Sequence, residues 1–309
     1  MDHTDRSPIG EAVAAAATVT ATVCAPVATP DSPLWLGHWG SVRPTVLILG
    51  GFLTAPPMYL PLVGRLMARG AAGAVVAPVW TPDWLLAGVR GIGPICTRSA
   101  KALRDAVHLS ARVSEGAPLL LIGHSAGGIT GRLLTATEPL AGRRFGAARS
   151  IGAIVTLGTP HRLSGGEGIG RRIDEVSASI ADAAVPGAFF APDTGYLAVT
   201  SRAVRGDPNG TGRERVAYLL YRSIAGRAAV AGTEGDGLVP TWASGLDGAR
   251  LLVLDAAVHG PGAAGSWYGS EDALDVWWPI ALETWRAALE RRRRPPAASP
   301  PASSADGQV

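Results

Sequence analysis

One serine stands where a strand, a sharp turn and a helix would expose its hydroxyl. Ser125 is the centre of Gly123-His124-Ser125-Ala126-Gly127, a G-x-S-x-G pattern between the apolar run Leu119–Ile122 and a helical pattern. A turn this sharp leaves no room for large side chains two residues before and after the serine. The helix that follows begins beside the hydroxyl, where its dipole and the free N–H of Ala126 favour negative charge. The pattern therefore predicts a nucleophilic serine.

A serine hydroxyl needs a base to take its proton and an acid to orient that base. Among six histidines we expect the base to be His259, because it follows the last strand in a Gly-rich loop. That position fits the chain order serine, acid, histidine. His161 lies beside the expected site but precedes any acid-bearing strand. The remaining histidines stand in the N-terminal tail, before the first strand, on a helix flank and inside the turn itself: His3, His38, His108 and His124.

The candidate acid is Asp236, in the segment AVAGTEGDGLVPTWAS between the serine and His259. Its Asp-Gly pair follows a β-rich run and precedes apolar residues, so it would present a carboxylate on a tight turn at a strand end. A buried carboxylate there would hold the imidazole in the required tautomer. Glu234 and Asp255 are the alternatives. Asp255 ends the His259 strand itself and is too close along the chain to face that ring easily.

A second backbone donor would complete a site for a developing oxyanion. The run Thr45–Leu49 ends in Gly50-Gly51-Phe52-Leu53, where glycine lets the main chain approach a substrate oxygen. We expect the Phe52 N–H to act with that of Ala126, with the Leu53 N–H as the alternative. A nucleotide-binding loop is excluded, because neither G-x-G-x-x-G nor a GK[ST] ending is present.

Short apolar runs alternate with longer helical patterns along the chain. This alternation is typical of α/β proteins with a mainly parallel, doubly wound sheet and helices on both faces. Such sheets bind ligands beyond the carboxyl ends of their strands, where the candidate residues stand. We expect strands at Thr45–Leu49, Ala74–Val79, Leu119–Ile122, Ala153–Leu157, Ser223–Ala231 and Arg250–Leu254. We expect helices at Ala55–Arg69, Arg98–Ser114, Gly127–Thr137 and Ala273–Arg292.

One long segment breaks this rhythm and divides the chain. Residues 161–215 hold a Gly-rich start, a helical pattern and a turn-rich end, which predicts a cap or lid inserted in the domain; an extra surface helix is the alternative. The domain itself is expected to span residues 34–290. A loose extension would occupy residues 1–33, and the low-complexity residues 291–309 predict a disordered tail.

The composition excludes several classes of protein. The chain has 309 residues, of which 47% are hydrophobic and 17% charged, so collagen-like, disulfide-scaffold and coiled-coil classes do not fit. A formal net charge of +3 gives no reason to expect a nucleic-acid partner. No apolar stretch reaches the roughly 18 residues of a transmembrane helix. The composition does not bear on the oligomeric state.

The N-terminus and the cysteines concern the compartment. Residues Ala12–Val27 are apolar, but acidic residues outnumber the single arginine before them, whereas an export signal carries net positive charge there. We therefore expect a cytoplasmic protein, with export as the alternative. Cys24 and Cys96 have no metal-binding spacing, so we expect two isolated thiols rather than a disulfide.

Several motifs together resemble the α/β-hydrolases of the lipase/esterase kind, and in particular the lipase-like hydrolases of plastids and bacteria. The similarity covers Thr45 to Trp285 and runs through GGF, LIGHSAGG, VTLGTPH, PGAFF, GDGLVP and VHGPGAAGSWYGS. The resemblance implies the hydrolase fold, Ser125 as nucleophile, Asp236 as acid, His259 as base and no cofactor. The chain departs from the family at LGGF, where lipases usually carry HGF or PGF, and it has no counterpart of the calcium site of larger bacterial lipases.

The aromatic and apolar residues near these motifs predict a pocket for an apolar acyl or aryl ester. We expect its lining to include Phe52, Leu53, Tyr59, Trp80, Trp84, Phe189, Phe190, Trp267 and Tyr268. The sequence thus favours a serine hydrolase of carboxylic esters acting through an acyl-enzyme. The alternatives are a thioesterase or acyltransferase with the same three side chains, a lipid-processing enzyme similar to GPI inositol-deacylases, and a non-catalytic binding protein.

Overall fold

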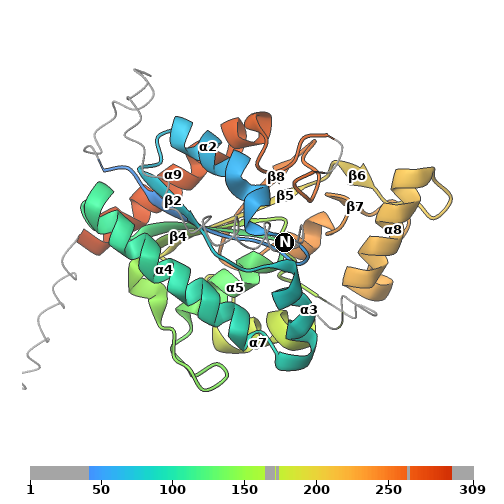
Figure 1. The fold of residues 1–309 in the computed structure, drawn as a ribbon. Coiled ribbons are helices and arrows are strands. Elements are labelled where there is room, and N and C mark those ends of the chain that lie inside the picture. Colours follow the sequence, from blue (N-terminus) through green and yellow to red (C-terminus); the bar gives the residue numbers. More distant parts are fainter. Residues whose placement is uncertain (1–41, 164–170, 172–173, 263–264, 294–309) are drawn as a thin grey trace, which may run out of the picture.

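A parallel sheet of six strands forms the centre of the protein (Figure 1). The computed structural model describes residues 42–163, 171, 174–262 and 265–293. The strand order is β2-β1-β3-β4-β5-β8, and every neighbouring pair is parallel. The strands are β1 (Thr45–Leu49), β2 (Gly73–Val76), β3 (Leu119–His124), β4 (Ile151–Leu157), β5 (Gly195–Ser201) and β8 (Arg250–Leu254).

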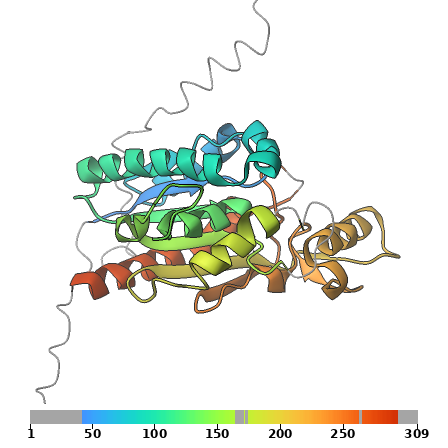
Figure 2. The ribbon, with the colours of Figure 1, turned by 90° about the horizontal axis from the view of Figure 1, so that it is seen from below.

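Helices cover both faces of this sheet, as Figures 1 and 2 show from two directions. One face carries α2 (Leu60–Ala68) and α9 (Glu271–Arg293), and the other carries α3 (Thr81–Arg90), α4 (Gly93–Val113), α5 (Ala126–Thr135) and α7 (Ser179–Ala184). Short helical turns lie at Pro56–Tyr59, Ala147–Ser150, Asp174–Ala178, Gly226–Ala228 and Thr241–Ser244. The parallel strands therefore end together, along one edge of a sheet that is buried on both sides.

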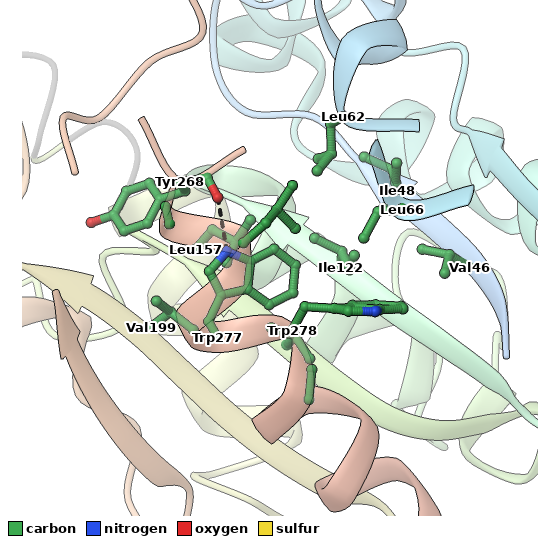
Figure 3. Packing of buried hydrophobic residues seen from close by; sticks show 14 of the residues in the cluster. Val46, Ile48, Leu62, Leu66, Ile122, Leu157, Val199, Tyr268, Trp277 and Trp278 are labelled. Carbon is green, nitrogen blue, oxygen red and sulfur yellow. Dashed lines mark hydrogen bonds between the residues drawn. The ribbon is translucent and has the colours of Figure 1, made fainter. Parts of the chain in front are cut away.

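The core follows the alternation of side chains along the strands. In β1, Val46 and Ile48 pack toward α2 and α9, whereas Leu47 and Leu49 pack toward α4 and α5. Three tryptophans anchor α9: the indole N–H groups of Trp277, Trp278 and Trp285 donate to the carbonyls of Tyr268, Arg69 and Pro118 (Figure 3 shows the first two rings). Each ring thus buries a large apolar surface while its single polar group is satisfied.

A small lobe stands at one end of the sheet (Figure 2). It contains α8 (Gly212–Ala225) between β6 (Val204–Arg205) and β7 (Glu234–Gly235), which pair in antiparallel fashion. A capping box between Thr211 and Glu214 begins α8. The lobe follows β5 in the chain and ends at the turn that carries Asp236.

Two sequence predictions about this region are wrong. The strand expected at Ser223–Ala231 is the end of α8 and the helical turn behind it; the capping box before it is the signal that the apolar run obscured. Residues 161–215, expected to form one cap, contain the core strand β5. The polar residues at the carboxyl end of that strand, Thr200 and Ser201, hid it from the sequence analysis, although both are fully buried between β4 and β8.

The end of the chain also differs from the prediction. Helix α9 continues to Arg293, beyond the domain boundary expected at residue 290. Arg292 holds this last turn in place, because its guanidinium donates to the carbonyls of Ala148, Arg149, Ile151 and Asp193. The N-terminal extension expected at 1–33 and the tail from residue 294 lie outside the described residues, as does Cys24, while Cys96 is a buried free thiol. Within the described ranges, no helix combines the length and the hydropathy that spanning a bilayer requires.

The contact between α5 and β1 gives a prediction about stability. A methyl group at Gly127 would overlap the carbonyl oxygen of Leu49, whereas one at the exposed Gly64 in α2 would meet nothing. Gly127→Ala should therefore lower the free energy of unfolding by about 1–3 kcal/mol. Gly64→Ala, the matched control, should raise it by about 1 kcal/mol through helix propensity. Urea denaturation measures both, and an unchanged Gly127→Ala protein would contradict the predicted overlap.

Candidate active site

Ser125 lies on the turn between β3 and α5 with strained backbone angles, φ 53° and ψ −131°. Only tight packing around it can maintain this conformation. A methyl group at Gly123 would overlap the Cα of Gly128, and one at Gly127 would overlap the Leu49 carbonyl. The small residues predicted on either side of the serine are therefore required by contacts with main-chain atoms.

Two hydrogen bonds connect three side chains that are distant in sequence. The Nε2 atom of His259 lies 2.9 Å from the Ser125 Oγ, and its Nδ1 atom lies 2.8 Å from Oδ2 of Asp236. A carboxylate only accepts hydrogen bonds, so the proton of a neutral imidazole resides on Nδ1 and the lone pair of Nε2 faces the hydroxyl. The main chain adds a third link, because the His259 N–H donates to the Asp236 carbonyl at 2.9 Å.

Asp236 is 2% exposed, and its carboxylate accepts four hydrogen bonds. The amides of Leu238 and Val239 donate to Oδ1 at 3.0 and 2.8 Å, while the Tyr268 hydroxyl joins His259 at Oδ2, at 2.9 Å. Burial by itself would raise the pKa of Asp236, but the adjacent imidazole and these donors outweigh burial and lower that pKa. The carboxylate is thus held ionised in a site that excludes water.

The other candidates for acid and base lie elsewhere. Asp255 is exposed and pairs with Arg202 at 2.7 Å, and Glu234 is exposed on β7. His161 is buried, with its Nε2 3.1 Å from Thr156 Oγ1 and its Nδ1 beside the guanidinium of Arg132. Burial and that neighbouring positive charge lower the pKa of His161 well below its usual value. None of these three residues contacts Ser125.

The expected oxyanion donors flank the serine. A methyl group at Gly51 would lie 2.6 Å from the Ser125 Cβ, so the turn after β1 passes directly against the hydroxyl-bearing residue. Within the described part of the chain, the N–H groups of Phe52 and Ala126 donate to no protein acceptor. Leu53, the alternative to Phe52, has a positive φ of 59° and is half exposed.

A cavity of about 900 Å³ opens onto Ser125 and His259. Its volume lies within the usual range for small-molecule sites. Of the nine predicted lining residues, Phe52 and Leu53 do line it. The lining also includes residues that the sequence analysis missed: Met58, Pro160, Tyr218, Leu219, Leu220, Arg222, Ser223, Ile224, Leu238, Val239 and Pro261. Six of these eleven residues belong to α8, whose end was wrongly predicted to be part of a strand.

The other seven predicted lining residues do not line this cavity. Trp84 is buried against the ring of Phe52, Trp80 caps α3, and Phe189 packs edge-on against Phe190. The remaining three, Tyr59, Trp267 and Tyr268, are buried beside the candidate catalytic residues. The Tyr268 hydroxyl donates to Asp236 Oδ2. Large aromatic side chains near a motif support its geometry as readily as they line a pocket, and sequence alone does not separate these roles.

No group of His, Cys, Asp and Glu side chains suited to a metal ion occurs in residues 42–163, 171, 174–262 and 265–293. The groups that the structure brings together at this site are a hydroxyl, an imidazole and a buried carboxylate.

The six-stranded parallel sheet, with helices on both faces and these side chains at its carboxyl edge, is the α/β-hydrolase fold. Two solved structures of a bacterial lipase are similar to this chain in fold. The mature form of a lipase from Bacillus licheniformis is 14% identical over 85% of this chain and 96% of its own, with a TM-score of 0.53. Its propeptide form is 15% identical over 81% of this chain and 52% of its own, with a TM-score of 0.51. No protein-family model and no curated protein matches the chain by sequence.

The lowered pKa of Asp236 predicts how stability depends on pH. Because its folded-state pKa lies below the ordinary value of 3.8, the ionised carboxylate stabilises the folded protein above that pH and loses this effect as the pH falls through the folded-state value. Asp236→Asn cannot titrate, so its deficit in unfolding free energy should shrink on acidification below about pH 4. Urea denaturation between pH 3 and 7 measures the deficit, with Asp255→Asn as the matched loss of an exposed carboxylate. Parallel curves for wild type and Asp236→Asn would contradict the shift.

Proposed function

We propose that the protein is a serine hydrolase that cleaves carboxylic esters through Ser125, His259 and Asp236. The observation that carries this proposal is the continuous line of hydrogen bonds, 2.9 and 2.8 Å long, from the hydroxyl through the imidazole to a buried carboxylate. The three residues come from three separate segments, and this arrangement activates serine on several unrelated folds.

The first half of the reaction would form an acyl-enzyme. His259 Nε2 takes the proton of Ser125 while Oγ attacks the ester carbonyl, and Asp236 stabilises the resulting imidazolium. The N–H groups of Phe52 and Ala126 would bind the oxyanion, with the helix dipole of α5 adding positive potential. The imidazolium then gives its proton to the departing alkoxide, so the C–O bond breaks and an alcohol leaves.

The second half returns the enzyme to its starting state. Water loses a proton to His259 Nε2 and attacks the acyl carbonyl, and the same two amides bind the second oxyanion. Collapse of this intermediate breaks the bond to Ser125 Oγ, which recovers its proton from the imidazolium. A carboxylic acid leaves, and no cofactor is needed for either half.

The cavity supports an apolar acyl or aryl ester as substrate. Side chains of Phe52, Leu53, Met58, Leu219 and Ile224 dominate its lining, so binding would come mainly from the burial of apolar surface. We assign the role of cap to α8, because it contributes six lining residues to the cavity. The predicted cap, residues 161–215, instead contributes strand β5 to the central sheet.

Other acyl-transfer reactions would use the same residues. A thioesterase needs only a different leaving group, and an acyltransferase needs an acceptor other than water at the second step. Processing of a lipid similar to that by GPI inositol-deacylases would fit the apolar lining as well. The intact hydrogen-bonded line of three side chains favours catalysis over a purely binding role.

Covalent labelling tests the proposed nucleophile. Wild-type protein should react with a fluorophosphonate probe and hydrolyse p-nitrophenyl esters, whereas Ser125→Ala should do neither, because the attacking oxygen is absent. Acyl chains from acetyl to palmitoyl show which length the cavity accepts. Labelling that persists in Ser125→Ala would overturn the assignment. Labelling of wild type without ester turnover would favour the thioesterase or acyltransferase alternative.

The acid is tested with a matched pair of variants. Asp236→Asn should lower kcat for the best p-nitrophenyl ester by about 10⁴-fold, because the amide favours the wrong tautomer of His259. Asp255→Asn should remain near the wild-type rate, since Asp255 is exposed and pairs only with Arg202. The opposite order of the two variants would identify Asp255 as the acid instead.

A further inference from the structure

The histidine next to the nucleophile is buried but makes polar contacts on both ring nitrogens. His124 is 1% exposed, its Nε2 lies 2.7 Å from the main-chain carbonyl of His259, and its Nδ1 lies 2.8 Å from the Tyr59 hydroxyl. The rings of Tyr59 and Trp267 meet it edge-on, with centroids 5.8 Å away in both cases. A histidine sequestered in this way is not needed for any proton transfer in the mechanism above.

The protonation of this ring follows from its neighbours. Burial, and then the proximity of His259, lower the pKa of His124 to about 3, so the ring is neutral at ordinary pH. A neutral imidazole has one N–H, and the His259 carbonyl can only accept, so the proton is on Nε2. The lone pair of Nδ1 then accepts a hydrogen bond from the Tyr59 hydroxyl at 2.8 Å, which is shorter than the 3.1 Å to the other acceptor of that hydroxyl, Thr54 Oγ1. Tyr59 Oη in turn accepts from the Gly51 N–H at 3.0 Å.

These bonds all point in one direction, from the turn beside Phe52 to the loop of the base. The Gly51 N–H donates to Tyr59 Oη, the Tyr59 O–H donates to His124 Nδ1, and the His124 Nε2–H donates to the carbonyl of His259. Hydrogen bonds aligned in this way strengthen one another in a dry interior. The His259 peptide groups are thereby fixed on both sides, since its N–H donates to the Asp236 carbonyl and its C=O accepts from His124.

We propose that His124 is a positioning residue that holds the main chain of His259, and that Tyr59 fixes the tautomer of His124 for this task. The inference rests on the proposed function, because the residue being positioned is the base of that reaction. Tyr59 also holds the turn that offers the Phe52 N–H. One line of hydrogen bonds therefore aligns the base and the oxyanion donor with Ser125 between them.

Two amide substitutions separate this role from simple packing. In His124→Gln the amide nitrogen reaches the position of imidazole Nε2 and can still donate to the His259 carbonyl, while the Tyr59 hydroxyl can turn to Thr54 Oγ1, 3.1 Å away. In His124→Asn the amide ends near the position of Nδ1. It can accept from Tyr59 but does not reach the carbonyl. Both variants leave a polar, uncharged group in the same buried space.

The measurement is the rate constant of labelling by a fluorophosphonate at saturating probe, together with the unfolding temperature. We expect His124→Asn to react about 10²-fold more slowly than wild type, the usual effect of a displaced catalytic group. His124→Gln should recover most of the rate although the two unfold at similar temperatures. Equal rates in the two variants, whether both slow or both fast, would overturn the proposal.

Tyr59→Phe provides a second route if His124→Asn does not fold. Its labelling should also be slower, and combining it with His124→Gln should cost less than the product of the two single effects, because both act on one line of bonds. Fully multiplicative effects on the labelling rate would contradict the proposal that Tyr59 and His124 act through one line of hydrogen bonds.

A spectroscopic readout separates this proposal from the proposed function. Histidine ¹⁵N spectra of wild type should show His124 as the Nε2–H tautomer at pH 7, whether or not the protein hydrolyses esters. If wild-type protein shows this tautomer but is never labelled, the hydrolase proposal is wrong and the hydrogen-bonded line through His124 still holds. If His124 is the Nδ1–H tautomer or a charged ring, the proposed line of hydrogen bonds is wrong and the hydrolase proposal still holds.

Discussion

A buried negative charge organises this site. The Asp236 carboxylate is removed from water, and a carboxylate in that position is costly unless each oxygen is well solvated by protein donors. Two main-chain amides, an imidazole and a phenol supply that solvation. Each donor must lie at a fixed place. The charge therefore restricts the turn at residues 237–239, the loop of His259 and the position of Tyr268 in the loop before α9.

The close approach of main-chain segments around Ser125 restricts several positions to glycine. Three segments meet here: the turn after β1, the turn that carries Ser125 and the start of α5. They lie so close together that glycine is required at positions 51 and 127. Glycine is also required at position 158, because a methyl group there would lie 2.6 Å from Asp236 Oδ2. The ends of β1, β3 and β4 thus bring three main-chain segments close together at the site. In the proposed reaction, amide dipoles there would act on the ester carbonyl at short range.

The sequence predicted the parts of this protein whose signals are local. The strands before residue 160 are short apolar runs, so these early elements were found. The motif around Ser125 has its own steric requirement, and chain order suggested Asp236 and His259. The structure brings these three side chains within hydrogen-bonding distance, and their catalytic roles stay predictions. The sequence did not reveal β5, whose buried Thr200 and Ser201 resemble a loop. It did not reveal α8 either, because the apolar run Ser223–Ala231, which starts in the last turn of that helix, resembles a strand. Tyr59, Trp267 and Tyr268 were predicted to line the pocket, which is wrong: they pack behind the site, through tertiary contacts that no local pattern encodes.

The lobe that contains α8 leaves and re-enters the domain at neighbouring points. Val204 pairs with Gly235, and Gly206 exchanges main-chain hydrogen bonds with Thr233 and Gly232, so the two stems are fastened to each other before the chain reaches Asp236. Lengthening or shortening a segment whose ends are clamped together adds little entropy cost and leaves the clamp in place. The lobe could therefore vary in length and sequence without moving the turn that carries Asp236, and in the proposed enzyme such changes would alter which substrates fit the cavity.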